Sequence, residues 1–230
     1  MNASLNPTQA DILRRMFEQD GLRFSEINTA KLPTDQFSYH LRQLMKAKLI
    51  EKLPDETYRL TYLGKKQTIM LPSEGTKFIQ QGFVAVLLIV SQQKEGQELF
   101  LAHQRNKVPN KGNIGFFGDK VRYGEDTEGA AKRALTLQAG LTGEPHLHSI
   151  WHLIDKIKDT VVEDKYFFIY GVTEFQGELQ RVGITGENKW MTFQEMKDTG
   201  ELFHEIENFI ASTKSEGVTY HEQFTERESY

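Results

Sequence analysis

The chain has 230 residues, of which 38% are hydrophobic and 26% are charged, so it is long enough for one or two domains with a buried core. It contains no cysteine, which excludes disulfides and any Cys-ligated zinc or iron–sulfur site. The longest apolar run, FVAVLLIV at residues 83–90, is far shorter than the ~20 residues that a membrane-spanning helix needs. We therefore expect a soluble, cytoplasmic protein without a membrane partner.

Charge is unevenly distributed, although the net charge of the whole chain is only −4. Residues 1–70 carry 11 Lys or Arg against 8 Asp or Glu, whereas residues 71–230 carry 17 against 24. Such an asymmetry indicates two parts that have different partners.

Helix signals open the chain. Asn6 precedes Pro7, and Gln9 stands three residues after Asn6, a combination that predicts a capped helix start. Apolar residues then recur at helical spacing until Gly21, which predicts the helix end. A second, short helix is expected at residues 24–29.

A third helix is expected from Thr34, as its cap, to about residue 49. Its apolar stripe contains Phe37, Leu41 and Leu44, and the opposite face is basic, polar and free of acids. The segments LIEKL and YRLTYL follow, separated by the polar turn PDET, and this pattern predicts a β-hairpin.

Three helices followed by a hairpin predict a winged helix-turn-helix. The segment SYHLRQLMKAKLIEKLPDETYRLTYLGKK resembles the recognition helix and wing of bacterial winged-helix transcription regulators. In that family the third helix enters the major groove and the wing touches the backbone, so the resemblance implies double-stranded DNA as the partner and a homodimer as the binding form. Such modules also serve as protein adaptors. The residues implied for DNA contact are Ser38, Tyr39, His40, Arg42, Gln43, Lys46, Lys52 and Arg59.

The remaining chain is predicted to hold a linker, a second domain and a tail. Pro72 and Gly75 favour a linker at residues 71–81 after a first domain at 1–70. Strand-like segments alternate with helical ones over residues 82–215, with KWMTFQEM among the strands and a helix at 201–213. Residues 216–230 are polar and are expected to form a loosely ordered tail.

The segment GDKVRYGEDTEGAAKRALTLQAGL, residues 118–141, resembles the signature of the Nudix family. That signature is a Gly, five residues, a Glu, seven residues, and then Arg-Glu-aliphatic-any-Glu-Glu-any-Gly-aliphatic. Glu125, Arg133 and Leu135 occupy their positions, as do Gly140 and Leu141 at the end. The resemblance implies a Nudix-like α/β/α sandwich, so the whole chain is predicted to be an α+β two-domain protein.

The signature lacks its metal ligands in this chain. Asp119 stands where the first Gly is expected, and Ala134, Leu137 and Gln138 stand where the family has Glu. Residues spaced i, i+3 and i+4 share one helix face, which in the family presents carboxylates to divalent cations. Ala and Leu offer no oxygen to a metal ion. The resemblance therefore predicts no metal, no other cofactor and no hydrolysis of the family's usual kind.

Cations near the signature are candidates for binding an anionic ligand. Glu125 and Arg133 are, by the resemblance, paired to hold the loop against the helix. The residues assigned to the ligand are Arg105, Lys120, Arg122, Glu125 and Arg133, and Lys132 is a further cation in reach. Alternatives are a metal held by His146, His148 and His152, or replacement ligands supplied by Glu163, Asp164 or Glu187.

A DNA-binding module joined to such a domain predicts a transcription regulator. Its inactive Nudix-like domain would sense a nucleotide-derived metabolite such as ADP-ribose or a nucleotide sugar. The domain composition resembles Nudix-related regulators of NAD and sugar metabolism, although those place the winged helix last. The alternatives are a nucleoside-diphosphate hydrolase with displaced metal ligands and a protein–protein adaptor.

Overall fold

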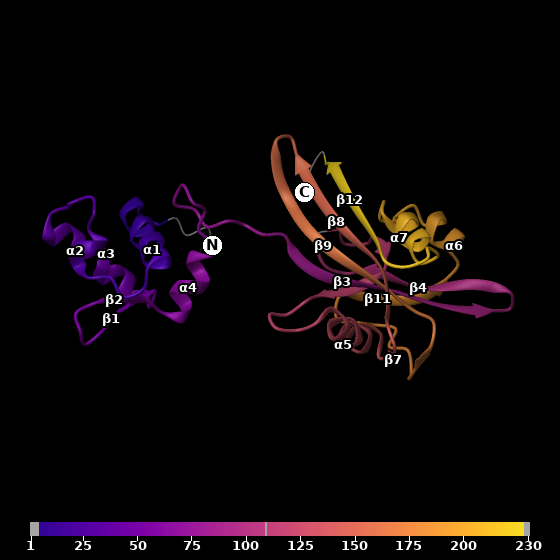
Figure 1. Cartoon of the computed structure of the whole chain (residues 1–230). Helices are drawn as coiled ribbons and strands as arrows, with labels where there is room; N and C mark the ends of the chain where they lie inside the picture. The colour runs from indigo at the N-terminus through magenta and orange to yellow at the C-terminus, as the bar shows by residue number, and fades with distance from the viewer. Residues whose placement is uncertain (1–4, 109, 228–230) are drawn as a thin grey trace. The chain divides into compact units, whose positions relative to one another are not determined.

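The computed structural model describes residues 5–108 and 110–227. The chain divides into an N-terminal unit, Met1–Gln81, and a C-terminal unit, Gly82–Tyr230, which are described separately (Figure 1). No helix in the described ranges is both long and apolar enough to cross a membrane.

The first helix of the N-terminal unit is α1, Pro7–Glu18, and it begins as the sequence predicts. The Asn6 side chain accepts a hydrogen bond from the Thr8 N–H at 2.9 Å, and the Gln9 side chain accepts one from the Asn6 N–H at 3.2 Å. These bonds satisfy N–H groups that have no partner inside the helix. The helix ends at Glu18, with Gln19 as its C-cap, and Gly21 follows with a φ of 71°.

The next elements are α2, Phe24–Ile27, α3, Thr34–Lys46, β1, Ile50–Lys52, and β2, Tyr58–Leu60. Helix α3 buries Phe37, Leu41 and Leu44 against α1, as its stripe predicts. The cap prediction at Thr34 is wrong, because Pro33 precedes α3 and no side chain caps it. The hairpin is shorter than predicted, since Thr61 caps a further helix, α4, Tyr62–Thr68.

Residues 71–81 were predicted as a linker, but they belong to the N-terminal unit. Leu71 is buried in its core, the Arg14 Nε donates to the Pro72 carbonyl at 3.0 Å, and the Leu5 N–H donates to the Thr76 carbonyl at 3.0 Å. Tertiary contacts at Leu71 and Arg14 therefore order a segment whose Pro and Gly suggest a flexible connection.

The C-terminal unit is built on a twisted mixed sheet with the strand order β11-β4-β3-β9-β8-β12. Outside this order, β5 pairs with β4 and β6 pairs with β3. Strands β7 and β10 form a separate two-stranded sheet. The strands are β3, Phe83–Lys94; β4, Gln97–Arg105; β5, Ile114–Gly115; β6, Phe117–Lys120; β7, Thr142–Gly143; β8, His146–Ile157; β9, Thr160–Val172; β10, Phe175–Gln176; β11, Gly186–Met191; and β12, Thr219–Glu226.

Helices cover both faces of this sheet (Figure 1). Successive side chains of β3 point to opposite faces, so Val86, Leu88 and Val90 pack with α5, Thr127–Ala139, whereas Ile89 packs with α7, Ile206–Ser212. This is the mixed α/β arrangement that the C-terminal sequence predicts. Helix α6, Phe193–Asp198, corrects the prediction of a strand over KWMTFQEM, because Thr192 ends β11 and caps a helix with Glu195.

The prediction of a loosely ordered C-terminal tail is also wrong, because most of this segment forms a strand. Strand β12 pairs in parallel with β8, from Thr219 beside Ser149 to Glu226 beside Lys156. His221 stacks on Trp151 with 4.2 Å between ring centroids, and Arg227 Nη2 lies 2.6 Å from the carboxylate of Asp155. The last residues of the predicted tail, 228–230, lie outside the described residues.

Candidate functional site

Helix α5 and the loop before it contain the signature residues. The Asp126 side chain caps α5 by accepting a hydrogen bond from the Gly129 N–H at 2.6 Å. Gly140 ends the helix with a φ of 71°, a left-handed conformation that suits glycine. The signature helix thus has a side-chain cap at its start and a glycine at its end.

The predicted pairing of Glu125 with Arg133 is confirmed. Arg133 Nε lies 2.7 Å from Glu125 Oε1, and its Nη2 lies 2.8 Å from Glu125 Oε2, so the pair is bidentate. Arg133 also bonds Asp119, the residue that replaces the family's glycine, and the Lys120 carbonyl. Arg133, together with the Arg122 N–H, lowers the pKa of Glu125 to about 2. Most polar atoms of the pair are therefore used inside the protein, and contact of Glu125 and Arg133 with a ligand stays a prediction.

The other three cations assigned to a ligand lie on two segments. Lys120 and Arg122 are exposed at the end of β6 and in the loop before α5, where Lys120 Nζ lies 4.8 Å from the ring centroid of Phe83. Arg105 ends β4 and is half-buried, with its Nε donating to the Lys107 carbonyl at 3.0 Å. Lys120 and Arg122 are therefore the two with side chains open to solvent.

The face of α5 that would carry metal ligands does not fit a metal ion. Ala134 is completely buried and Leu137 is 39% exposed, and neither has a side-chain oxygen. Gln138 is buried, and its Oε1 accepts hydrogen bonds from the Thr185 N–H at 3.2 Å and the Thr185 hydroxyl at 3.0 Å. A divalent cation such as Mg²⁺ needs about six oxygen ligands. These three side chains supply none that is free.

A neutral network closes this face. Asn188, which is 4% exposed, donates from Nδ2 to the carbonyls of Gln138 at 2.6 Å and Gln180 at 2.9 Å. Its Oδ1 lies 2.8 Å from His103 Nδ1, and His103 Nε2 lies 3.0 Å from the Thr185 hydroxyl. Because both Asn188 N–H groups are donated, its oxygen must accept, so the proton of neutral His103 is on Nδ1; Nε2 is then an acceptor that shares the single Thr185 hydroxyl hydrogen with Gln138 Oε1. We call His103, Gln138, Thr185 and Asn188 the buried network.

Burial keeps this network uncharged. It lowers the pKa of His103, so the imidazole is neutral at pH 7. The loop before β11 lies against α5, since a Cβ added to Gly183 would be 2.3 Å from the Gln138 carbonyl oxygen. Sequence reasoning missed His103, Thr185 and Asn188. The sequence pattern could have indicated that these side chains point inward on or near neighbouring strands. It could not have indicated that they bond to α5.

The sequence profile of the NUDIX domain matches residues 82–211, which is more than half of the chain. The chain belongs to the Nudix family. A comparison with curated protein sequences gives no match.

Solved structures with a similar fold are Nudix proteins. A MutT protein from Bacillus halodurans has a TM-score of 0.50 and 21% identity, over 60% of this chain and 89% of that one. The NUDIX domain of Shewanella oneidensis NrtR, solved with ADP ribose, has a TM-score of 0.49 and 14% identity, over 59% and 88%. A MutT NUDIX hydrolase from Burkholderia pseudomallei has a TM-score of 0.46 and 19% identity, over 59% and 100%. Identities this low show the fold alone.

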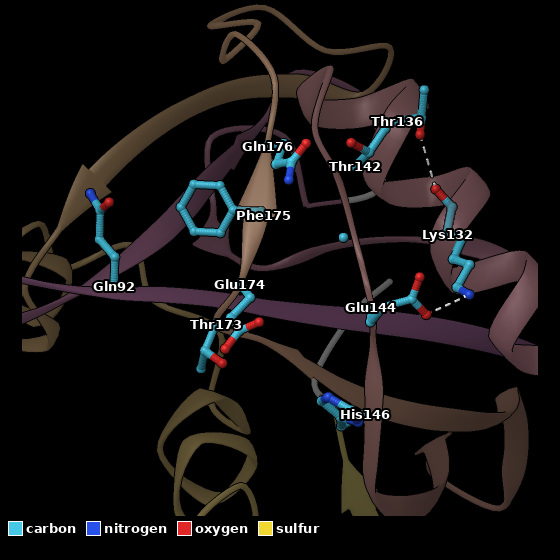
Figure 2. Close-up of a pocket in the computed structure, with 11 residues that line it drawn as sticks. Gln92, Lys132, Thr136, Thr142, Glu144, His146, Thr173, Glu174, Phe175 and Gln176 are labelled. Carbon is cyan, nitrogen blue, oxygen red and sulfur yellow. Dashed lines mark hydrogen bonds and ion pairs between the residues drawn. The ribbon is translucent and has the colours of Figure 1, made fainter.

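The Nudix domain also has an open cavity of ≈ 960 Å³ between α5, β7 and β10. Figure 2 shows Lys132 and Thr136 of α5 on one side and Phe175 and Gln176 of β10 on the other. Lys132 Nζ lies 2.9 Å from Glu128 and 2.6 Å from Glu144, and these carboxylates raise its pKa. Lys132 is therefore already neutralised, and the cavity does not favour a diphosphate.

The three histidines of β8 do not converge. A register shift between Leu147 and Ser149 interrupts the alternation that would have placed His146, His148 and His152 on one side. His152 instead lies between Asp164, at 3.0 Å, and Glu222, at 3.2 Å. Within residues 5–108 and 110–227, no group of three or more His, Cys, Asp or Glu is arranged to hold a metal.

The acids considered as replacement metal ligands are used differently. Glu163 bonds Lys165, and Asp164 bonds His152. Glu187 is exposed on β11, two residues after Thr185 of the buried network. Its neighbour Asn188 points toward α5, so the Glu187 side chain points away from α5, because successive side chains of a strand face opposite ways.

In the N-terminal unit, α3 presents part of the predicted DNA-binding set to solvent. Tyr39, Arg42 and Lys46 are exposed, and Ser38 and Gln43 are partly exposed. His40 is only 7% exposed, so the prediction that its side chain contacts DNA is wrong. Its Nδ1 has no hydrogen-bond partner within the described part of the chain. Its position beside the apolar stripe turns it toward the core.

The hairpin cations are exposed but paired. Lys52 Nζ bonds the Glu56 carboxylate, and Arg59 Nε lies 2.7 Å from Glu51 Oε1. These hydrogen bonds raise the pKa of both cations. The sequence reasoning counted the cations without the neighbouring acids.

Proposed function

We propose that this protein is a DNA-binding transcription regulator. In this proposal the N-terminal unit is a winged helix-turn-helix, and the Nudix domain binds a nucleotide-derived metabolite without hydrolysing it. Two copies of the chain bind two half-sites, and the metabolite changes the placement of the two winged helices. The affinity for DNA then depends on the metabolite, because the two winged helices can bind both half-sites only when their separation matches the spacing of the half-sites.

The observation that carries the proposal is the buried network on α5. Gln138, at a position where the family has a metal-binding Glu, is hydrogen-bonded to Thr185 and Asn188 in a closed protein interior. A metal would have to break these bonds and would find no carboxylate at Ala134 or Leu137. Metal-assisted hydrolysis by the family's usual ligands is therefore disfavoured.

The DNA-binding half of the proposal is supported by the order of elements and by α3. Three helices precede a two-stranded hairpin, and α3 exposes Arg42 and Lys46 one turn apart on the face opposite its buried stripe. Lys and Arg on one helix face neutralise phosphates and release counterions. For the metabolite, we propose the exposed cations Lys120 and Arg122 together with Arg105.

The first experiment captures genomic DNA fragments on the purified full chain, with and without ADP-ribose, nucleotide sugars and dinucleotides. We expect a few palindromic sites, released or gained with one metabolite. The variant Arg42→Ala/Lys46→Ala should lower affinity for these sites and reduce the steepness of its salt dependence. No enrichment at low salt would refute the DNA-binding role and leave the protein–protein adaptor as the reading of this unit.

A second candidate function is a nucleoside-diphosphate hydrolase with displaced metal ligands. It is favoured by membership of the Nudix family, and the exposed Glu187 is the replacement ligand that it would use. Release of phosphate or nucleoside monophosphate with Mg²⁺ or Mn²⁺, lost in Glu187→Gln and retained in the exposed control Glu207→Gln, would establish this function in place of a purely sensing domain.

A further inference from the structure

The hairpin of the N-terminal unit carries more negative than positive charge. Residues 50–60 contain three acids, Glu51, Asp55 and Glu56, and two cations, Lys52 and Arg59. Both cations bond an acid of the same hairpin. Asp55 accepts hydrogen bonds from the N–H and hydroxyl of Thr57, which lower its pKa and keep it charged.

This charge opposes contact with a phosphate backbone. A phosphate that displaced Glu51 from Arg59 would leave the carboxylate close by, and Asp55 would remain unpaired at the turn. Exposed ion pairs are weak, so the pairing itself is easily exchanged. The excess of carboxylates still opposes phosphate binding, because the carboxylates stay on the hairpin when a phosphate replaces them as the partner of a cation.

The segment before the hairpin has the opposite character. Residues 36–49 contain Arg42, Lys46 and Lys48 and no acid. All three side chains are exposed, and none lies within ion-pair distance of an acid in the described part of the chain. Lys48 follows α3 in a left-handed turn with a φ of 58°. Positive charge therefore extends from the exposed face of α3 into the turn that joins it to β1.

Helix α4 is fixed beside this turn. The Thr61 hydroxyl donates to the Lys48 carbonyl at 2.6 Å and accepts from the Gly64 N–H at 3.0 Å, so one side chain both holds the turn and caps α4. The Thr61 N–H donates to the Leu49 carbonyl at 3.0 Å. The turn that carries Lys48 is thus held in place by the fold, and exposed Lys65 lies in the last turn of α4.

We propose that the phosphate contacts of this module come from the end of α3 and the following turn, through Arg42, Lys46 and Lys48, and that the hairpin stays off the DNA backbone. This inference rests on the proposed DNA-binding function. It differs from the family expectation, which assigned Lys52 and Arg59 of the hairpin to the phosphates. The hairpin acids then act against any docking that brings the wing onto the backbone.

The test measures the affinity of the full chain for a random-sequence DNA duplex as a function of salt. Losing one phosphate contact lowers the slope of log affinity against log salt by about 0.9 and weakens binding about eightfold at ~0.1 M salt. We expect this loss for Lys48→Ala. The matched double variant Lys52→Ala/Arg59→Ala should keep the parent slope, whereas Glu51→Gln/Glu56→Gln, which removes two of the three hairpin acids, should raise the slope by letting the freed cations reach the backbone.

The outcomes separate this inference from the proposed function. If the parent chain does not bind DNA at low salt, both fail. If the parent binds but Lys52→Ala/Arg59→Ala lowers the slope by about two contacts, or Lys48→Ala leaves it unchanged, the inference alone fails and the wing regains its phosphate role. All of the substituted residues except Glu51 are exposed, and Glu51 is partly exposed, so thermal melting of each variant should stay close to that of the parent.

Discussion

Removing Asn188 tests whether the buried network closes the metal face of the Nudix domain. Asn188→Ala leaves two buried groups without their partner, His103 Nδ1 and the carbonyl of Gln138, and also removes a donor from the part-buried carbonyl of Gln180. An unsatisfied buried polar group costs about 1–3 kcal/mol. Taking the lower end for each of the two buried groups, we expect a loss of roughly 2 kcal/mol in the free energy of unfolding.

The expected loss is measurable in the full chain. For a domain of this size, 1 kcal/mol corresponds to about 2–4 °C in melting temperature, so Asn188→Ala should melt roughly 4–8 °C below the parent. Tryptophan fluorescence is the suitable signal, because both tryptophans of the chain, Trp151 and Trp190, belong to the C-terminal unit. The N-terminal unit does not contribute to this signal.

The matched control is Asn208→Ala, which removes an exposed Asn from α7 and should leave the melting temperature within about 1–2 °C of the parent. If Asn188→Ala also melts with the parent, the network is not closed. Gln138 and its surroundings would then be accessible, and the argument that no metal fits this face would lose its basis.

Three further predictions concern the same domain. Burial lowers the pKa of His103 below its unfolded value of 6.5, so the unfolded chain binds the proton more readily, and the free energy of unfolding should fall as pH drops below 6.5. His103→Gln should weaken the dependence of the melting temperature on pH below 6.5. An unchanged pH dependence would exclude His103 as its cause. Arg133→Ala should lower the melting temperature and Arg133→Lys should not restore it, because Lys cannot form the bidentate bond, while exposed Arg122→Ala serves as the control. Ala134→Glu should destabilise the domain by burying a charge, whereas Leu137→Glu, at a 39% exposed position, should be tolerated, and neither should give Mg²⁺-dependent hydrolysis in a phosphate-release assay.

Signals confined to a few neighbouring residues were predictable from the sequence. The capping box at Asn6, the start of α5 at Asp126 and its end at Gly140 depend on side chains within three or four residues of each other. The Glu125–Arg133 pair was predicted through its fixed spacing in a known signature. Each of these features is decided locally, so one sequence is enough to find it.

Features that depend on distant partners were not predictable. His103 and Asn188 are 85 residues apart in the chain, and only the pairing of β4 with β11 brings them together. Residues 71–81 looked like a linker because the groups that order them, such as Arg14, lie 58 or more residues away. His40 failed for a related reason, since a position at the flank of a helical stripe turns inward or outward according to its neighbours in space.

Strand β12 shows the same limit most clearly, and its anchoring can be tested. Its alternate residues face outward, and Phe224 is 64% exposed, so apolar burial contributes little and the sequence reads as a polar tail. Arg227 Nη2, in contrast, lies 2.6 Å from Asp155, which is 1% exposed. Removing one partner of a buried ion pair costs about 3–5 kcal/mol, and because Lys165 still bonds Asp155, we expect about 2 kcal/mol for Arg227→Met.

Phe224→Ser provides the comparison for this strand, because it removes a large hydrophobic side chain, far more hydrophobic than that of Arg227, from a mostly exposed position. By tryptophan fluorescence, Arg227→Met should melt about 4–8 °C below the parent, and Phe224→Ser should melt close to it. Trp151, on which His221 of β12 stacks, makes this signal sensitive to the strand's detachment. The reverse order of melting temperatures would mean that β12 is held by its outward apolar face, and the ion pair would not explain why a polar segment forms a strand.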